Sequence, residues 1–400
     1  MQRVYLDNAA TTRVRDEAVT AMLPYFTEYY GNPSSLHSFA RDAGRGVDTA
    51  RAQVATAIYA RPEEIIFTAG GSESDNMALR GIARAYQKQG SHIVTTAVEH
   101  HAVLHTLQAM EREDGVSVTY LPVDEYGRVT AAQVEAAIRP ETILVSVMFA
   151  NNEVGTVMPI PEIGAVCRAH KVLFHTDAVQ AVGHVPVDVE AMQIDLLSLS
   201  GHKFHGPKGI GALYVKKGVR LPALITGGGQ ERKKRAGTEN VPGMVGLGKA
   251  IELAAAELPE NAERMRALRD KLIAGMQARI PDIKLNGHPA ERLPNNVNFS
   301  IRYIEGESIL LMLDLNGIAA SSGSACTSGS LDPSHVLLSL GLPHEIAHGS
   351  LRLSFSDENT LEDAEYILLV LPGIVARLRD MSPLWERIKR EERTPCTQNK

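Results

Sequence analysis

Short apolar segments alternate with amphipathic segments through the first half of the chain. Seven runs rich in β-branched and other apolar residues predict strands, and stretches between them, such as 75–89 and 101–113, have the spacing of amphipathic helices. Nearly continuous apolar strands that alternate with helices are typical of a mostly parallel sheet covered on both faces. The predicted strands are 64–69, 92–98, 116–123, 142–150, 172–178, 196–200 and 211–217.

The second half of the chain predicts a smaller set of elements. A long helical pattern from about 243 to 280, broken near Pro259, is expected to lead from the first set to the second. After it come a predicted strand at 296–303, a helix at 307–316 and, beyond a Ser- and Gly-rich stretch, a strand at 350–356. This mixture is expected of a small α+β unit.

The length of the chain also favours two domains, because 400 residues exceed what one hydrophobic core usually serves. We predict an α/β protein whose large domain, 15–260, contains the mostly parallel seven-stranded sheet. The smaller α+β domain would combine 1–14 with 261–400.

Composition and charge narrow the possible partners. The chain is 44% hydrophobic and 22% charged, and its net charge is 41 − 47 = −6, which argues against a general nucleic-acid-binding protein. The single basic run at 232–235 is weak evidence to the contrary and fits the rim of an anionic cofactor site better. The most apolar late stretch, 366–376, is interrupted by Pro372 and is too short to span a bilayer. We therefore expect neither a nucleic-acid nor a membrane partner.

Three cysteines occur, Cys167, Cys326 and Cys396, without CxxC spacing or an even-numbered framework. This usage predicts reduced thiols in a cytoplasmic protein. Cys167 lies in an apolar helical pattern and is expected to be buried and inert, and Cys396 lies in the tail. Cys326 lies in the segment 321–330, where seven residues are Ser or Gly. Such a segment is expected to be mobile, which suits a thiol that must attack its target in one place and deliver the acquired group elsewhere. An exposed thiol without a function is the alternative, because it would have the same pattern.

A possible anion-binding site follows the first predicted strand. Gly70, Gly71 and Ser72 open the next helix, where free backbone N–H groups bind anions and glycines allow close approach. An ordinary serine N-cap explains the same residues and is the more common case. On its own the motif is weak.

Two ionisable residues at strand ends carry a more specific signal. Asp177 ends an apolar strand, where a carboxylate requires a cationic partner; a structural ion pair and the protonated nitrogen of a pyridine ring are both open. Lys203 follows another apolar strand, among Gly, His and Ser, and burial there would lower its pKa and free its amine for a Schiff base. Ser200 and His202 flank it, within reach of a cofactor phosphate.

The segment around Lys203 reads SGHKFHGPKGIGALYV, and further motifs are VYLDNAATT, GNPSSLHSFA, VEHHAV, ANNEVGT, HTDAVQAVG, RAGTEN, SSGSACTSGSLDPSH and SPLW. Together they resemble cysteine desulfurases of the NifS/IscS type, which are class V aminotransferase-fold enzymes dependent on pyridoxal 5′-phosphate. The resemblance runs from Val4 to Trp385 and implies a PLP-dependent transferase fold of type I. RAGTEN and the cysteine segment are the most specific motifs and are closest to the nitrogen-fixation-type branch.

The resemblance implies a role for each matching residue. Lys203 would bear the cofactor, Asp177 would pair with the ring nitrogen, and His100 would stack on the ring and move protons at the substrate thiol. Arg352 would clamp the substrate carboxylate through its bidentate guanidinium. Cys326 would be the nucleophile. The remaining implied cofactor or substrate contacts are Gly71, Ser72, Asn152, Gln180, Ser200, His202 and, from a second subunit, Thr238.

The implied reaction converts L-cysteine to L-alanine. Lys203 would remove the α-proton, and the Cys326 thiolate would attack the substrate sulfur and retain it as a persulfide. The implied partners are a second copy of the chain, in a homodimer, and an iron–sulfur scaffold of the NifU/IscU type. No resident metal is expected; Cys326 would meet a scaffold's cluster only transiently. Ser72 stands where the family has Thr, and the tail after Trp385 departs from the housekeeping enzymes, which leaves the sulfur acceptor open.

Other functions are compatible with parts of the chain. A selenocysteine lyase or another class V activity shares the fold, and an aminotransferase would not need Cys326. The run from His344 to His348 matches HExxH, a zinc-protease signature. Its helix would be hardly more than a turn, and Leu351 stands where the extended pattern requires Gly. Solvated polar positions on a short helix are therefore the favoured interpretation.

Overall fold

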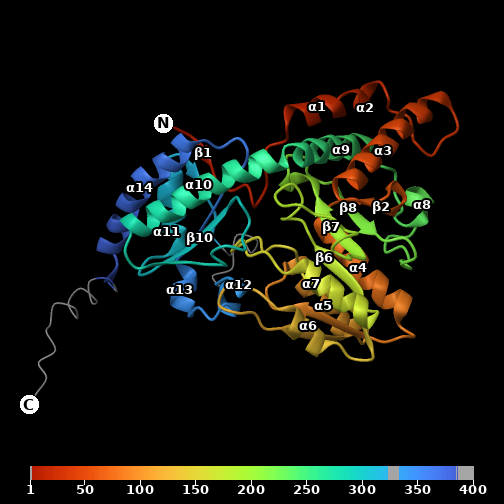
Figure 1. The fold of residues 1–400 in the computed structure, drawn as a ribbon. Coiled ribbons are helices and arrows are strands. Elements are labelled where there is room, and N and C mark those ends of the chain that lie inside the picture. Colours follow the sequence, from red (N-terminus) through yellow and green to blue (C-terminus); the bar gives the residue numbers. More distant parts are fainter. Residues whose placement is uncertain (1, 323–332, 384, 386–400) are drawn as a thin grey trace, which may run out of the picture.

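The computed structural model describes residues 2–322, 333–383 and 385, and a seven-stranded sheet forms the centre of its larger part (Figure 1). All seven predicted strands are present, in the spatial order β2-β8-β7-β6-β5-β3-β4. Pairs among β3 to β7 are parallel, whereas β8 is antiparallel to both β2 and β7. The predicted α/β class with a mostly parallel sheet is confirmed. The strands are β2 Ile65–Thr68, β3 His92–Thr96, β4 Ser117–Leu121, β5 Thr142–Ser146, β6 Leu173–Asp177, β7 Leu196–Ser200 and β8 Gly211–Val215.

Helices cover both faces of this sheet, and the alternation along each strand decides which core a residue joins. Leu196 and Leu213 pack under α4 and α5, whereas Leu197 and Ala212 pack toward α3, α7 and α9. Successive side chains of a strand point to opposite faces, so a fully apolar strand serves two cores at once. The helices are α1 Asp16–Met22, α2 Pro24–Thr27, α3 Ser38–Ala57, α4 Gly71–Tyr86, α5 His101–Glu113, α6 Ala131–Ala137, α7 Ile160–His170, α8 Gln230–Lys233 and α9 Val241–Ala256, with short 3₁₀ turns η1 Pro62–Glu64 and η2 Gly201–Lys203.

Two helix predictions change in detail. Helix α4 begins at Gly71 rather than at 75, because its first turn is polar and the apolar repeat starts only after it. The predicted segment 243–280 is two helices, α9 and α10, that meet at Glu257. Pro259 lies in the first turn of α10, where its missing N–H would have had no intrahelical partner.

A separate apolar core lies at the other end of the molecule (Figure 1). There a three-stranded antiparallel sheet of order β12-β10-β9 packs with α10, α11 and α14, and β1 near the N-terminus pairs with β11. The N-terminal strand thus joins elements from the second half of the chain. The elements are β1 Val4–Tyr5, α10 Leu258–Arg279, β9 Ile283–Leu285, β10 Asn296–Ile301, α11 Gly306–Leu315, β11 Ile318–Ala319, α12 His335–Ser339, α13 His344–His348, β12 Ser350–Ser354 and α14 Leu361–Asp380.

Within the part of the chain that the structure describes, no helix combines the length and the apolar character needed to cross a bilayer.

A charged cluster joins the two ends of the molecule. Asp357, just after β12, accepts a hydrogen bond from Arg15 and lies 2.8 Å from Nε2 of His205, two residues beyond Lys203. Arg15 also contacts Glu257 at 2.5 Å, where α9 meets α10. Nδ1 of His205 lies 2.9 Å from the carbonyl oxygen of Arg13. The cluster ties the Lys203 turn to the strand that carries Arg352.

This cluster predicts a pH-dependent stability for Asp357→Asn. Burial alone would raise the pKa of Asp357, but the hydrogen bonds and charges of His205 and Arg15 outweigh it and hold that pKa below its ordinary value. A depressed folded-state pKa contributes stability above the unfolded pKa of about 4, and this contribution is lost as pH falls. We expect the variant to lose about 1.5–3 kcal/mol of unfolding free energy at pH 7, the range for hydrogen bonds to charged groups.

Urea denaturation at pH 7 and between pH 4 and pH 3 measures this difference, which should become smaller as pH falls below the unfolded-state pKa and would vanish only below the depressed folded-state pKa. Glu358→Gln is the control, because Glu358 is an exposed partner of Arg13 and its loss should cost less than about 0.5 kcal/mol. A loss at Asp357 that does not depend on pH would contradict the prediction.

Candidate active site

A cavity of about 350 Å³ opens where β6 and β7 end and α4 begins. Open α/β sheets bind ligands at the carboxyl ends of their strands, and this cavity follows that rule. It gathers residues from segments far apart in the sequence. The lining residues are Ala9, Ala10, Gly71, Ser72, Asp75, His100, Met148, Ala150, Asn152, Asp177, Val179, Gln180, Ser200, His202, Lys203 and Arg352.

Lys203 projects into this cavity from the short turn η2 that follows β7. Its Nζ donates hydrogen bonds to the carbonyl oxygens of Ala9 (2.6 Å) and Ala10 (2.8 Å). The amide of Gln180 donates to the same Ala9 oxygen at 2.9 Å. The N-terminal segment therefore holds the amine in place inside the cavity.

Asp177 is the last residue of β6 and is 6% exposed. Its Oδ1 accepts a hydrogen bond of 2.9 Å from the backbone N–H of Val179. Burial raises the pKa of Asp177 to about 6, although the Val179 N–H and the charge of Lys203 both act to lower it. A cationic group in the cavity would therefore stabilise the ionised carboxylate.

His100 precedes α5 and caps it. Its Nδ1 accepts a hydrogen bond of 3.1 Å from the backbone N–H of Ala102, so the proton of the neutral ring lies on Nε2. Burial, followed by the charge of Lys203, lowers the pKa of His100 to about 4. The same two causes lower the pKa of His202 to about 4. Both imidazoles are thus neutral at pH 7 and act as hydrogen-bonding groups.

The start of α4 forms the anion-binding end of the cavity. Gly70 has a φ of +152°, which favours glycine, and a side chain at Gly71 would place its Cβ 2.7 Å from Cγ2 of Val179. Ser72 and Ser200 line the same end, so hydroxyl groups and the N-terminus of a 16-residue helix face one space. An anion placed there would meet free N–H groups and a favourable helix dipole.

Arg352 approaches the cavity from β12 and is 2% exposed. Its Nη1 donates to the carbonyl oxygen of Asn152 and its Nη2 to Oδ1 of Asp7, each at 3.0 Å. Its buried Nε has no hydrogen-bond partner. A fixed guanidinium with an unused buried donor is suited to bind a carboxylate.

One described site residue of the prediction does not line the cavity. Thr238 is exposed, in the segment between α8 and α9. Cys326 lies outside the residues that the structure describes. Cys167 is 1% exposed, and burial raises the pKa of its thiol to about 12, as expected of an inert thiol.

The structure adds residues that sequence reasoning missed. Asp75 lines the cavity although it is the fifth residue of α4, and no local pattern marks it. Glu99 is fully buried beside His100; its Oε1 accepts hydrogen bonds from Thr96 (2.8 Å) and from the N–H of Met148 (2.9 Å). Burial raises the pKa of Glu99 to about 8. A polar residue that precedes a histidine carries no sequence signal of such burial.

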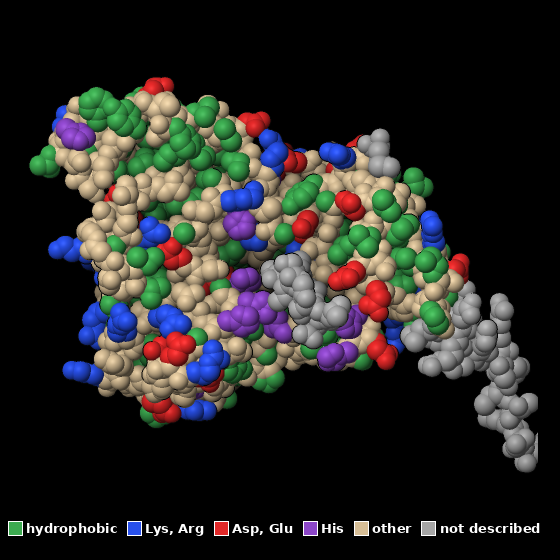
Figure 2. Space-filling model, turned by 180° about the vertical axis from the view of Figure 1, so that it is seen from behind, with side chains coloured by type: hydrophobic (Ala, Val, Ile, Leu, Met, Phe, Trp, Pro, Cys, Tyr) green, Lys and Arg blue, Asp and Glu red, His purple; other side chains and the backbone are tan. Residues whose placement is uncertain are grey.

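Histidine side chains gather in the middle of the face shown in Figure 2. The ring of His101 lies 4.6 Å from those of His105 and His335, and 6.3 Å from that of His100, measured between centroids. Nε2 of His335 lies 3.0 Å from the carbonyl oxygen of Glu99, so this ring nitrogen carries the proton.

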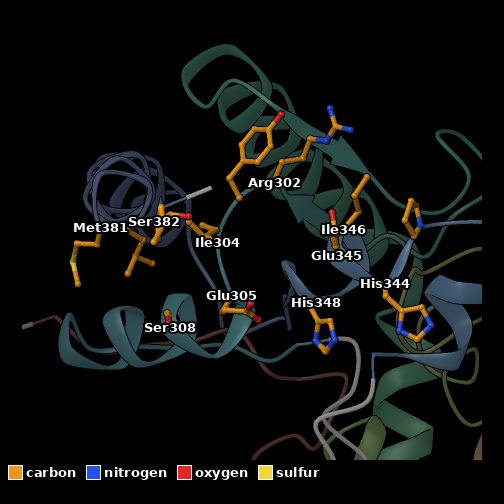
Figure 3. A pocket seen from close by; sticks show the side chains of 14 residues that line it. Arg302, Ile304, Glu305, Ser308, His344, Glu345, Ile346, His348, Met381 and Ser382 are labelled. Atoms are coloured by element: carbon orange, nitrogen blue, oxygen red, sulfur yellow. The ribbon is translucent and has the colours of Figure 1, made fainter. Parts of the chain in front are cut away.

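A larger cavity, of about 820 Å³, lies apart from these residues, between α11, α13 and the end of α14 (Figure 3). His344 and His348 of the HExxH run both line it, from a helix of five residues. Among the described residues no group of three or more His, Cys, Asp or Glu side chains is arranged to hold a metal ion. The smaller cavity is the better candidate for chemistry, because Lys203 and the buried Asp177 and Arg352 face it.

Comparison with known proteins identifies the family. The pattern of the family Aminotransferase class-V matches residues 4–367. The chain is 60% identical to a protein named cysteine desulfurase IscS from Clostridium botulinum, over 96% of this chain and 97% of that relative. The chain belongs to the class-V aminotransferase family. A solved NifS-like protein matches with a TM-score of 0.89 at 39% identity, covering 94% of this chain and all (100%) of that one. A structure of SspA in complex with cysteine matches with a TM-score of 0.80 at 37% identity, over 89% of this chain and 100% of SspA.

Family membership confirms the predicted family, and the PLP-dependent fold of type I with it. Class-V enzymes of the desulfurase type depend on pyridoxal phosphate, which bears out the predicted cofactor. The cavity fits this group on its own evidence. Three groups face the same space. The amine of Lys203 suits the aldehyde, the buried carboxylate of Asp177 suits the ring nitrogen, and the glycine-lined helix start at Gly71 suits the phosphate.

The close contact at Gly71 predicts that Gly71→Ala weakens cofactor binding. Val179 would have to move away from the new Cβ, and its backbone N–H holds Asp177. We expect the dissociation constant for pyridoxal phosphate to rise by about tenfold, which corresponds to about 1.4 kcal/mol. Gly44→Ala in α3 is the control, because a Cβ there meets no atom within 4 Å. Equal affinities of the two variants, measured by equilibrium dialysis, would contradict the prediction.

Proposed function

We propose that the chain is a pyridoxal-phosphate-dependent cysteine desulfurase in which Lys203 holds the cofactor and Cys326 receives the sulfur. The observation that carries the proposal is that Asp177, Lys203 and Arg352 face one buried cavity beside an anion-binding helix start. Identity of 60% over nearly the whole length of a relative named cysteine desulfurase supports the activity.

Different residues of the cavity bind the cofactor and the substrate. When bound, pyridoxal phosphate supplies an aldehyde that bonds to amines and a ring that withdraws electrons from the substrate Cα. Asp177 keeps a proton on the ring nitrogen, and Gly71, Ser72, Ser200 and His202 hold the phosphate. Gln180 fixes the N-terminal segment through the Ala9 oxygen and faces the ring from that side.

Substrate binding falls to residues on the opposite side of the cavity. Arg352 binds the carboxylate of L-cysteine, using the donor that is unpaired in its buried setting. Asn152 lines the same side and orients the substrate amine. Lys203, once its amine is neutral, removes the proton from the substrate Cα. His100 exchanges a proton with the substrate sulfur through Nε2, the nitrogen that its capping bond leaves available.

Sulfur transfer is a nucleophilic displacement at sulfur. The Cys326 thiolate forms an S–S bond to the substrate sulfur while the Cβ–S bond breaks, and its electron pair stays on carbon. Proton uptake at that carbon and return of a proton to Cα give L-alanine, and the sulfur remains as a persulfide on Cys326. The persulfide then passes to a thiol of an acceptor protein by the same exchange chemistry.

Replacing the acceptor thiol tests this assignment. In Cys326→Ala we expect the absorbance of bound cofactor to be unchanged and sulfide release from L-cysteine to fall by at least about a hundredfold, because the nucleophile is gone. Mass spectrometry of the wild type after addition of L-cysteine should show a gain of about 32 Da, one sulfur atom, on the peptide that contains Cys326.

Cys396→Ala is the matched control, since Cys396 is a cysteine outside the proposed chemistry and should retain full activity. Normal turnover in Cys326→Ala would overturn the mechanism. Transfer of the amino group to a keto acid without sulfide release would instead favour an aminotransferase. A much higher rate with selenocysteine than with cysteine would favour a selenocysteine lyase.

We further propose a homodimer in which Thr238 completes the phosphate site of the second copy. A shallow hollow of about 480 Å³ lies outside the phosphate end of the cavity and is lined by Ser72, His202 and Lys208 among others. The exposed Thr238 lies far along the chain from this hollow and does not line it. Hydrophobic side chains also gather over α1, α2 and the start of α3 (Figure 2), where Leu36 is 95% exposed and Phe26 58%. An apolar patch of this kind on a globular protein marks an interaction surface.

Sedimentation tests the dimer. We expect the wild type to sediment as twice the chain mass of 43.4 kDa, and Leu36→Asp with Phe26→Asp to weaken association, because charges would be buried at the interface. Thr238→Ala should stay dimeric but bind pyridoxal phosphate about tenfold to a hundredfold more weakly, for the loss of one hydrogen bond to a charged group. A fully active monomer would contradict the proposal.

The cellular setting is proposed on the same basis. Three cysteines without paired spacing support a cytoplasmic protein, and the motifs RAGTEN and SSGSACTSGSLDPSH support a role in iron–sulfur cluster assembly, with the nitrogen-fixation-type branch the most similar. A scaffold protein of the NifU/IscU type would be the sulfur acceptor. We also propose the division into a large domain, 15–260, and a small domain formed by 1–14 and 261–400. The two separate apolar cores support this division, except that Val336, Leu337 and Ala347 pack in the first core.

A further inference from the structure

A row of polar side chains crosses the centre of the sheet next to Asp177. Ser146 on β5, His175 on β6 and Ser198 on β7 are all fully buried. Ser146 pairs with His175 in the strand register, and Ser198 pairs with Asp177, so the four side chains share one face. Helix α4 covers this face and contributes Asp75, which is 1% exposed. The proposed mechanism uses none of these residues except Asp177.

Hydrogen bonds connect this row into a chain. Oγ of Ser146 lies 2.9 Å from Nδ1 of His175, and Nε2 of His175 lies 3.1 Å from Oγ of Ser198. The Ser198 hydroxyl is also a hydrogen-bonding neighbour of the Asp75 carboxyl. Oδ1 of Asp75 lies 3.7 Å from Nε2 of His175, too far for a hydrogen bond, and has no other partner.

Asp75 and Asp177 are two buried carboxyls that line the same cavity, and their surroundings differ. Asp177 has the N–H of Val179 as a donor and the charge of Lys203 nearby. Oδ1 of Asp75 is buried without a donor, and Glu99 is a third buried carboxyl close by. Two neighbouring buried carboxyls do not both ionise, and the proton goes to the one whose anion is less stabilised. That carboxyl is Asp75.

The ionisation of the neighbouring groups agrees with this reading of the geometry. Burial raises the pKa of Asp75 well above its ordinary value and the charge of Asp177 raises it further, and both outweigh the hydrogen bond of Ser198, which acts to lower it. Burial lowers the pKa of His175 to about 3, so this imidazole is neutral and carries one proton.

The direction of the hydrogen bonds then follows from the protonation of Asp75. A neutral Asp75 donates its proton to Ser198, Ser198 donates to Nε2 of His175, and the imidazole proton must lie on Nδ1, facing Ser146. An ionised Asp75 would accept from Ser198 and reverse the chain, which places the imidazole proton on Nε2. A serine hydroxyl has one proton to donate, so the Nδ1–H tautomer of His175, whose Nε2 takes the Ser198 proton, requires Asp75 to be the donor to Ser198 and therefore neutral.

We propose that Asp75 is a positioning residue, a neutral carboxylic acid that is kept in place by Ser198 and His175 and leaves Asp177 as the single anion at the cofactor nitrogen. The inference rests on the proposed function, because it concerns the charge that faces the bound ring. A second anion beside Asp177 would leave one buried negative charge without a counter-charge. The neutral acid lines the cavity and adds no charge to it.

The tautomer of His175 provides a test in the wild-type holoenzyme. With ¹⁵N-labelled histidine, long-range ¹H–¹⁵N spectra at pH 7 distinguish Nδ1–H from Nε2–H, and the His175→Gln variant identifies the signal by its absence. We expect the Nδ1–H tautomer. An Nε2–H tautomer, or a doubly protonated ring, overturns the inference.

An isosteric variant provides the second test. Asp75→Asn mimics a neutral acid, so at pH 7 its cofactor absorbance band should be unshifted and its dissociation constant for pyridoxal phosphate within about threefold of wild type. Asp177→Asn should weaken binding by at least about a hundredfold, because it removes one partner of a buried charge pair. Thr176→Val is the control, since Thr176 lies between His175 and Asp177 on the opposite face and its buried hydroxyl has no partner.

The outcomes separate the inference from the proposed function. A shifted band or a change of more than about tenfold in Asp75→Asn, with Thr176→Val unchanged, means that Asp75 is charged and overturns the inference alone. A colourless wild type that does not bind pyridoxal phosphate overturns the proposed function, and the inference with it. If Asp75→Asn fails to fold, the tautomer of His175 in the wild type still tests whether Asp75 is neutral.

Discussion

The buried charge of Asp177 constrains the structure around it. A carboxylate at the end of an apolar strand loses its hydration and needs compensation from fixed groups. The N–H of Val179 and the amine of Lys203 supply part of it, and under the proposed function a protonated ring nitrogen would supply the rest. Asp177 and Ser200 lie on the same face of adjacent strands, so a ring paired with Asp177 and a phosphate held at Ser200 would lie on one side of the sheet. The position of one carboxylate would thus determine where the cofactor lies.

The neutral histidines follow from the same electrostatics. His100 and His202 lie in a cavity that already contains the cationic Lys203 and Arg352, and burial adds to the cost of another positive charge. As imidazoles they do not compete with the ring for Asp177. The capping bond of His100 also fixes which nitrogen carries its proton, so the neutral ring remains a directed donor.

The central strands and the two ionisable residues at strand ends could be predicted from the sequence, because both depend on local patterns. Apolar runs mark β6 and β7, and a charged residue after such a run is conspicuous. Helix α14 was less visible, since Pro372 interrupts its pattern. It continues through Pro372 because residues on either side of it, such as Leu371 and Ile374, pack in the second core. Long-range contacts have no local signal in the sequence. Examples are the hydrogen bond from Lys203 to the Ala9 carbonyl oxygen and the ion pair of Arg15 with Asp357.

The roles of Arg352 and Thr238 came from family resemblance alone, and the structure shows why residue-level reasoning could not supply them. Arg352 reaches the cavity through the pairing of β12 with β10 in a different core, which no spacing within the chain encodes. Cys326, although the composition of its segment is distinctive, lies outside the described residues, so its place relative to the cavity stays a prediction.

The polar row through β5, β6 and β7 runs against the usual composition of parallel sheets, whose central strands are apolar on both faces. Ser146, His175 and Ser198 are compatible with such a position because each hydroxyl and each ring nitrogen has a partner within the row. All the hydrogen bonds of the row form only if each group donates its proton in the same direction along the row. Under the proposal this direction is set by Asp75, which lies at the end of the row and lines the cavity. The core of the sheet and the charge at the active site are therefore not independent: a change of one proton at Asp75 would reverse the side-chain hydrogen bonds of the row, from Ser198 to Ser146.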